Sequence, residues 1–180
     1  PGEADVGLFI ALPLAKKTLR IPFLASGGCA TGHQLLAALA LGAAGVQIGT
    51  RFNATVECNI FPQSFKDQMV KADDRSTIMV MKPFKASSRV FKNKTAAEIS
   101  RIEKEKGVGL KFQDIGELVK FDMLREGIEK GDPDHGIWNC GQSVCLVDDV
   151  PTCRELVSRL IREAHEALDG VSFALARSRL

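Results

Sequence analysis

Phe23-Leu24-Ala25-Ser26-Gly27-Gly28 and Gly45-Val46-Gln47-Ile48-Gly49-Thr50 share one pattern, a short apolar run that stops at glycine. Such runs are typical of strands that are buried on both faces of a parallel sheet. Between them, His33 to Leu41 is rich in Leu and Ala, follows Thr31 as a helix cap and stops at Gly42. Strand, helix and strand within about thirty residues predict a right-handed βαβ unit with parallel strands.

Periodicity and capping patterns predict the elements outside this unit. Thr152 and Glu155 form a capping box, and apolar residues recur at helical spacing after them, so a long amphipathic helix is expected there. The further predictions are a helix over Leu8–Leu19 with a kink or early turn at Pro13, a strand over Thr77–Met81, short surface helices over Thr95–Lys130, and the final helix over Thr152–Leu168.

Composition excludes several classes of protein. The 180 residues are 45% hydrophobic and 26% charged, which fits one globular domain with a sizeable core. Basic and acidic residues nearly balance at a net charge of +2, so no nucleic-acid partner is expected. The longest apolar stretch, Leu35 to Ile48, contains two glycines and is shorter than the roughly 20 residues of a membrane span. Five cysteines, an odd number, favour free thiols and a reducing, cytoplasmic location.

The two glycine turns are the strongest functional signal in the chain. Ser26-Gly27-Gly28 and Gly49-Thr50 follow consecutive parallel strands, so both turns are expected at the same edge of the sheet. Glycine lets a phosphate approach backbone N–H groups, a helix N-terminus adds a favourable dipole, and Thr50 adds a hydroxyl donor. One glycine pair alone indicates only a tight turn. Two pairs at this spacing favour a phosphate or a phosphorylated cofactor, without specifying which one.

A family resemblance narrows this choice. The stretch IPFLASGGCATGHQLLAALALGAAGVQIGTRFNATVEC, Ile21 to Cys58, resembles the FMN-phosphate region of nitronate monooxygenases, once called 2-nitropropane dioxygenases. The resemblance implies a (β/α)8 barrel with FMN as cofactor. It assigns phosphate binding to Gly27, Gly28, Gly49 and Thr50, with Ser26 and Gln47 as weaker candidates.

The resemblance continues along almost the whole chain, through Arg89–Asn93, the stretch KFQDIGELV, Gly136–Trp138 and Gly141-Gln142. It implies oxidative denitrification of alkyl nitronates with O2. The later stretch is most similar to the branch with NADH:quinone reductases, so NADH and a quinone are the alternative small-molecule substrates. Gln142 is a candidate active-site residue, although it could equally cap a turn.

The fold class expected from these observations is α/β, the C-terminal portion of a (β/α)8 barrel with a helix-rich extension. Residues 1–55 are expected to form the FMN-binding barrel part, 56–149 the last barrel strand and the extension, and 150–180 a terminal helix packed on the barrel. The family's active-site histidine is expected just before Pro1, and the N-terminal half of the same barrel is the expected partner. This chain alone is therefore expected to have little or no turnover. A catalytically incomplete FMN- or phosphate-binding fragment, and a phosphate-binding barrel enzyme without flavin, remain alternatives.

Other candidate residues are better explained by structural roles than by catalysis or metal binding. His33, His135 and His165 sit on no catalytic signature. His135, Cys140, Cys145 and Cys153 lack the compact C-x2-C spacing of a zinc site, so no metal is expected. Cys29 follows the glycine pair near a helix start, where a thiolate would be stabilised, but a small packing residue is the preferred interpretation. Arg51 and Arg89 could each balance a phosphate or pair with a carboxylate such as Glu57.

Overall fold

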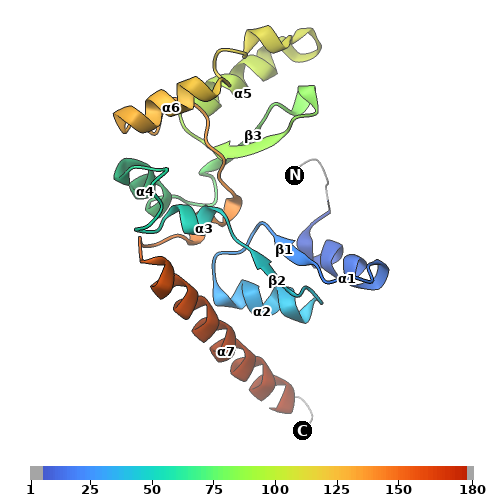
Figure 1. Ribbon diagram of the computed structural model, residues 1–180. Coiled ribbons are helices and arrows are strands. Elements are labelled where there is room, and N and C mark those ends of the chain that lie inside the picture. The colour runs from blue at the N-terminus through green and yellow to red at the C-terminus, as the bar shows by residue number, and fades with distance from the viewer. Residues whose placement is uncertain (1–5, 178–180) are drawn as a thin grey trace.

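The computed structural model describes residues 6–177, and Pro1-Gly2-Glu3 lie outside the described residues. Figure 1 shows an elongated molecule in which the first strands and the last helix form one end and the middle of the chain forms the other. The helices and strands are α1 (Leu8–Thr18), β1 (Leu24–Ser26), α2 (Gly32–Ala40), β2 (Gly45–Gln47), α3 (Thr50–Asn53), α4 (Gln63–Val70), β3 (Thr77–Val80), β4 (Ser88–Phe91), α5 (Lys94–Lys106), α6 (Phe121–Lys130) and α7 (Cys153–Arg177).

The predicted βαβ unit is confirmed. Strands β1 and β2 pair in parallel, with Ala25 opposite Val46, and α2 connects them. Helix α2 ends at Gly42, whose φ of 97° is a left-handed conformation that glycine adopts without steric cost. Leu12 of α1, Ala25, Ala38 and Ala43 form a small core between the helices and the strand pair. This unit fixes the position of the glycine turns that follow both strands.

Helix α7 packs on α2 at very close range. A Cβ atom at Gly32 would lie 2.2 Å from the backbone oxygen of Leu160, so only glycine fits at this crossing. The predicted capping box is present, because the N–H of Thr152 donates to Glu155 over 2.8 Å and the N–H of Glu155 donates to the Thr152 hydroxyl over 3.2 Å. The helix runs nine residues beyond the predicted end at Leu168, to Arg177.

The apolar surfaces of α2 and α7 are only partly covered. The composition of His33 to Leu41, rich in Leu and Ala, is typical of a buried helix, yet Leu39 is 44% exposed. Helix α2 is flanked by the strand pair and by α7, but not on its remaining side. On α7, Leu156 and Leu160 are buried, whereas Leu168 is half-exposed. The predicted stripe therefore packs only along its first turns.

The strand predicted over Thr77–Met81 exists as β3, and the structure shows its partner. It pairs antiparallel with β4, with Ile78 opposite Val90, in a separate two-stranded sheet, and not with β1 or β2. The last barrel strand expected within residues 56–149 stays a prediction. A short apolar run predicts a strand but does not specify its neighbour. Val80, Val90, Ile99 and Ile115 form the core that joins this sheet to α5.

A third core connects the extension to the first strands. The ring of Trp138 stacks on Phe91 with centroids 4.4 Å apart, and it also packs against Phe61 and Phe65. Residues from α3, α4 and β4 meet residues 138–147 in this cluster. The cluster holds the segment that follows Trp138 against the beginning of α3, which places it beside one of the glycine turns.

Candidate functional site

The two glycine turns line one cavity of about 270 Å³ at the carboxyl ends of β1 and β2. All six residues predicted for cofactor binding contribute to it. Four further lining residues were not predicted for it, and two of these come from the segment after Trp138. The lining consists of Ser26, Gly27, Gly28, Cys29, Gln47, Ile48, Gly49, Thr50, Gly141 and Ser143.

The first turn has a conformation that requires glycine. Gly27 and Gly28 have φ values of 93° and 70°, which side chains other than glycine rarely adopt. A Cβ atom at Gly27 or at Gly49 would meet no other atom within 4 Å, so both glycines border open space. Gly27 and Gly28 are thus required by the backbone conformation of the turn, and the side of Gly49 that a side chain would occupy is open.

Backbone N–H groups are the main donors at this cavity. Outside the β1–β2 ladder, the N–H groups of Gly27, Gly28 and Gly49 donate to no other described residue. The N–H of Thr50 belongs to the first turn of α3 and has no intrahelical acceptor. An anion in the cavity could therefore accept hydrogen bonds from both turns at once.

The N-terminus of α2 does not contribute as the sequence suggested. The N–H of Gly32 donates to the carboxylate of Glu163 on α7 over 2.7 Å. The side chain of Gln34 accepts from the N–H groups of Ala30 over 2.6 Å and of Thr31 over 3.1 Å. These donors are occupied, and the Glu163 carboxylate already neutralises this end of the helix dipole. The donors that remain at the cavity are therefore those of the turns.

Thr50 is held in place by the segment that follows Trp138. The N–H of Gly141 donates to Thr50 Oγ1 over 2.9 Å. Because this hydroxyl oxygen accepts one hydrogen bond, its own O–H is free to donate to a ligand. Ser143 lies two residues further along and is buried at the cavity lining. No local motif predicted either residue, because both reach the cavity through packing between distant parts of the chain.

No charged side chain lines the cavity. The buried guanidinium of Arg51 pairs with Asp149 and donates to the backbone oxygen of Ala54 over 3.3 Å, so Arg51 has a structural role. The pKa of the Asp149 carboxyl is lowered, mainly by hydrogen bonding to Arg159. Glu57 accepts from the N–H of Cys153 at the start of α7, which lowers the pKa of the Glu57 carboxyl. The carboxylate partner of Arg51 is thus Asp149 and not Glu57.

Gln142 and Cys29 lie at the edges of this site. Gln142 is exposed and does not line the cavity, although its two neighbours do. Cys29 lines it, but burial raises the pKa of its thiol, which favours the neutral form. This agrees with the interpretation of Cys29 as a small packing residue.

The remaining histidines and cysteines lie apart from the cavity. His33 and His165 are exposed, and His135 Nε2 lies 3.6 Å from a carboxylate oxygen of Glu126. The five cysteines are free. Within residues 6–177, no three His, Cys, Asp or Glu side chains converge as metal ligands would. Among the same residues, no helix combines the length and the apolar character of a membrane span.

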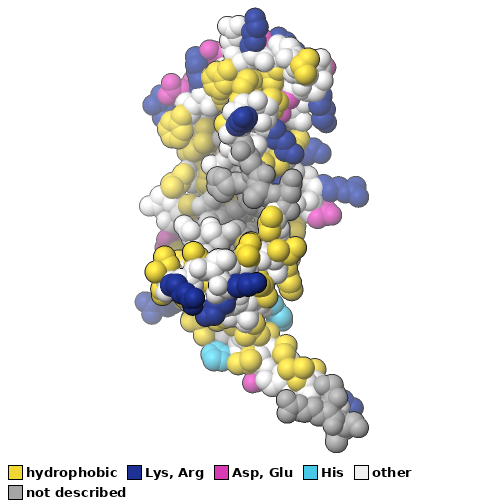
Figure 2. All heavy atoms as spheres, turned by 90° about the vertical axis from the view of Figure 1, so that its right-hand side faces the viewer, with side chains coloured by type: hydrophobic (Ala, Val, Ile, Leu, Met, Phe, Trp, Pro, Cys, Tyr) yellow, Lys and Arg dark blue, Asp and Glu magenta, His cyan; other side chains and the backbone are white. Residues whose placement is uncertain are grey.

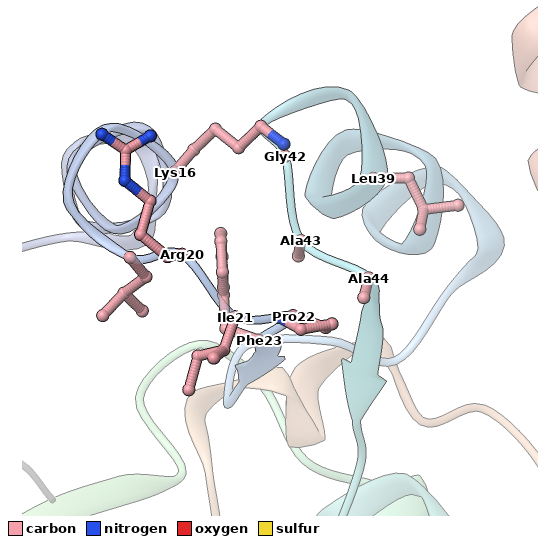
Figure 3. Close-up of a pocket in the computed structure, with 10 residues that line it drawn as sticks. Lys16, Arg20, Ile21, Pro22, Phe23, Leu39, Gly42, Ala43 and Ala44 are labelled. Carbon is pink, nitrogen blue, oxygen red and sulfur yellow. The ribbon is translucent and has the colours of Figure 1, made fainter.

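A larger cavity of about 510 Å³ lies at the opposite ends of β1 and β2. Figure 3 shows its lining, with Phe23 just before β1, Ala44 just before β2, and Lys16 reaching from α1 toward Gly42. A Cβ atom at Gly42 would lie 2.8 Å from Lys16 Cγ, so the stem of Lys16 packs directly on this turn. Ligands of parallel α/β sheets bind at the carboxyl ends of the strands, so this cavity is the less suitable candidate.

Comparison with known proteins identifies the family of this chain. Residues 1–163 match the family model described as nitronate monooxygenase. The chain is 29% identical, over 92% of its length, to a (3aS,4S,5R,7aS)-5-hydroxy-7a-methyl-1-oxo-octahydro-1H-indene-4-carboxyl-CoA dehydrogenase of Rhodococcus jostii, and covers 56% of that protein. It is 27% identical, over 90% of its length, to a probable nitronate monooxygenase of Bacillus subtilis, and covers 45% of it.

A solved structure shows the same arrangement. FabK from Thermotoga maritima superposes with a TM-score of 0.84 and 29% identity, over 95% of this chain and 53% of FabK. The chain thus spans about half the length of the relatives it matches. The predicted fold class is confirmed, namely a portion of a (β/α)8 barrel with a helix-rich extension.

Proposed function

Because the chain belongs to the nitronate monooxygenase family, we propose that it forms part of an FMN-dependent oxidoreductase and that its two glycine turns bind the FMN phosphate. One observation carries this proposal. Both turns and the Thr50 hydroxyl border a single cavity, and outside the β1–β2 ladder the N–H groups of the turn glycines donate to no other described residue. These donors suit a phosphate dianion, which accepts hydrogen bonds from backbone N–H groups that glycine leaves accessible.

The cavity fits a phosphate better than it fits a carboxylic substrate. It is bordered by small residues on both turns, and a phosphate has several acceptor oxygens that can be shared among four backbone donors and a hydroxyl. Ser26, Gln47 and Ser143 add polar side chains at its rim. The residues of this chain would anchor and orient the cofactor, while FMN would supply electron transfer.

The proposed reaction is oxidative denitrification of alkyl nitronates with O2. It rests on the family and on the names of relatives such as the Bacillus subtilis protein. An NADH:quinone reductase of the same family is the second candidate. A cavity that adjoins the phosphate site favours it, because its lining includes Arg89 and two asparagines, which suit the charged and polar groups of a dinucleotide.

We propose that further strands of the same barrel complete the sheet. Strand β1 has β2 as its one partner among the described strands, and Leu24 at its start is 59% exposed. On α1, Phe9 and Ile10 are 78% and 66% exposed. Figure 2, which views the side where α1 lies, shows apolar side chains at the surface in the lower half of the molecule. Packing of more barrel elements here would bury this apolar surface. In this proposal residues 1–55 belong to the barrel, 56–149 to the extension, and 150–180 to the covering helix.

Visible absorption of the full-length protein tests the proposal. Flavin bands that propyl-2-nitronate bleaches under anaerobic conditions would support the nitronate monooxygenase. Bleaching by NADH, followed by reoxidation with a quinone, would support the reductase instead. A flavin content that no substrate reduces would indicate a binding protein, and a protein that neither purifies with nor takes up FMN would contradict the proposal.

A further inference from the structure

Helix α7 contacts the polypeptide that follows each of the two glycine turns. Strands β1 and β2 pair only as far as Ser26 and Gln47, where their ladder ends. The glycine turns lie beyond this last pair, so the ladder does not fix the spacing between them. Figure 1 shows α7 running beside α2, the helix that follows the first turn. The start of α7 lies close to the end of α3, which follows the second turn.

On the side of the first turn, α7 holds the N-terminus of α2 through Glu163. The carboxylate of Glu163 accepts from the N–H of Gly32 over 2.7 Å. Gly32 is three residues after Cys29, which lines the proposed phosphate site. The backbone of Leu160 lies directly against Gly32, since a Cβ atom there would come within 2.2 Å of the Leu160 oxygen. The start of α2 therefore has little room to shift relative to α7.

On the side of the second turn, α7 acts through Arg159 and Asp149. Arg159 donates to both carboxylate oxygens of Asp149, over 3.1 and 2.6 Å. The same carboxylate pairs with the buried guanidinium of Arg51, which also donates to the backbone oxygen of Asp149 over 3.2 Å. Arg51 directly follows Thr50, which lines the proposed phosphate site. Charge-assisted hydrogen bonds thus link α7 to the first turn of α3.

The two connections start from neighbouring positions of α7. Arg159 and Glu163 are four residues apart, so they lie one above the other on the helix. A purely stabilising role explains this arrangement less well. The exposed pair of Arg162 and Glu166, 3.6 Å apart, stays within the helix, as a pair that serves only the helix would. The hydrogen bonds that begin at Arg159 and Glu163 instead lead to backbone one and three residues from the cavity lining.

We propose that Arg159 and Glu163 are positioning residues that hold the two glycine turns at the spacing that one phosphate requires. The inference rests on the proposed function, because that phosphate is the phosphate of FMN. Neither side chain lines the cavity, so each of them acts through another residue. A phosphate that accepts from both turns at once binds more weakly when either turn is free to move, since the turns must then be ordered on binding.

Titration of the full-length apoprotein with FMN, followed by quenching of flavin fluorescence, tests this inference. Arg159→Gln and Glu163→Ala should each raise the dissociation constant of FMN about 10-fold, as expected if about one molecule in ten keeps the turns in the binding arrangement. Glu163→Gln keeps an acceptor for the N–H of Gly32 and should restore most of the affinity. Arg162→Gln is the matched control, because Arg162 is exposed on the same helix and its partner Glu166 also lies there.

Riboflavin distinguishes positioning of the phosphate from a general loss of stability. It has the ring system and ribityl chain of FMN but no phosphate, so its dissociation constant should be the same in all variants. The affinity for FMN relative to riboflavin should therefore fall in Arg159→Gln and Glu163→Ala and stay unchanged in Arg162→Gln. Urea unfolding confirms that each variant is folded under the conditions of the titration.

The outcomes separate this inference from the proposed function. Wild-type affinity for FMN in Arg159→Gln and Glu163→Ala, whatever their stability, would overturn the inference and leave the proposed function standing. Equal weakening of FMN and riboflavin would overturn it as well. A wild type that binds no FMN would reject the proposed function and this inference together. Should either variant fail to fold, Arg159→Lys and Glu163→Asp replace them, since they weaken the same contacts, and wild-type affinity in both would reject the two roles.

Discussion

The N–H of Gly141 donates to the hydroxyl oxygen of Thr50 over 2.9 Å, across 91 residues of sequence. This contact joins the segment after Trp138 to the start of α3 and leaves the Thr50 O–H as a donor. It lies at the boundary of two adjoining cavities. The extension therefore completes the proposed phosphate site instead of merely covering it.

Replacement of Thr50 tests this contact directly. Thr50→Val keeps the side-chain shape but removes the hydroxyl, so FMN affinity should fall by about 10- to 100-fold, and the Gly141 N–H loses its acceptor. Thr50→Ser keeps the hydroxyl and should retain an affinity close to that of the wild type. Quenching of flavin fluorescence on titration of apoprotein gives both dissociation constants. If the Val variant binds FMN as tightly as the wild type does, the Thr50 hydroxyl does not contribute to FMN binding.

Replacement of Gly27 tests the conformational requirement of the first turn. Gly27→Ala introduces no clash, since a Cβ atom there meets nothing within 4 Å, but it forces alanine to a φ of 93°. The free energy of unfolding should fall by about 1–2 kcal/mol, and FMN binding should weaken with it. Gly109→Ala is the control, because its Cβ atom also meets nothing and its backbone is not in the left-handed region. Urea denaturation of both variants should show a loss only for Gly27→Ala.

The sequence predicted local features well and long-range neighbours poorly. The βαβ unit and the two turns were predictable because glycine positions and apolar runs act within a few residues. The contributions of Gly141 and Ser143 were not, since they depend on packing around Trp138. Likewise, the N–H of Gly32 is occupied by Glu163, which is 131 residues away. The partner of β3 was not predictable for the same reason, because strand periodicity carries no information on pairing.

The crossing of α2 and α7 makes a further prediction about stability. Gly32→Ala places a Cβ atom against the backbone oxygen of Leu160, which cannot move without shifting α7. The free energy of unfolding should fall by about 1–3 kcal/mol, the usual cost of overpacking. Gly170→Ala, within the exposed part of α7, meets no atom within 4 Å and should instead raise it by up to about 1 kcal/mol through helix propensity. Chemical denaturation of the two variants should thus give opposite signs, and a stable Gly32→Ala variant would contradict the close crossing.

The hydrogen bonds of Asp149 lead us to expect that part of the free energy of unfolding is lost in acid. Arg159 donates to both of its oxygens, over 3.1 and 2.6 Å, and this hydrogen bonding, together with Arg51, lowers the pKa of Asp149 below its ordinary value of 3.8. A group whose pKa is lowered on folding stabilises the protein above its unfolded pKa, and the contribution is lost as the pH falls through the folded pKa. This part of the stability should therefore be complete at neutral pH and disappear below about pH 4.

Asp149→Asn isolates that contribution from the other carboxylates. At pH 7 the variant should lose about 1–3 kcal/mol of unfolding free energy, because the buried guanidinium of Arg51 loses its counter-ion. Below pH 4 its unfolding free energy should approach that of the wild type, since acid protonates Asp149 in the wild type as well. Asp148→Asn is the control, because the Asp148 side chain is 83% exposed and lies 3.9 Å from Arg159. Urea unfolding at a series of pH values measures these differences. A gap between Asp149→Asn and wild type that stays constant from pH 7 to pH 3 would show that the charge of Asp149 is not the source of the stabilisation.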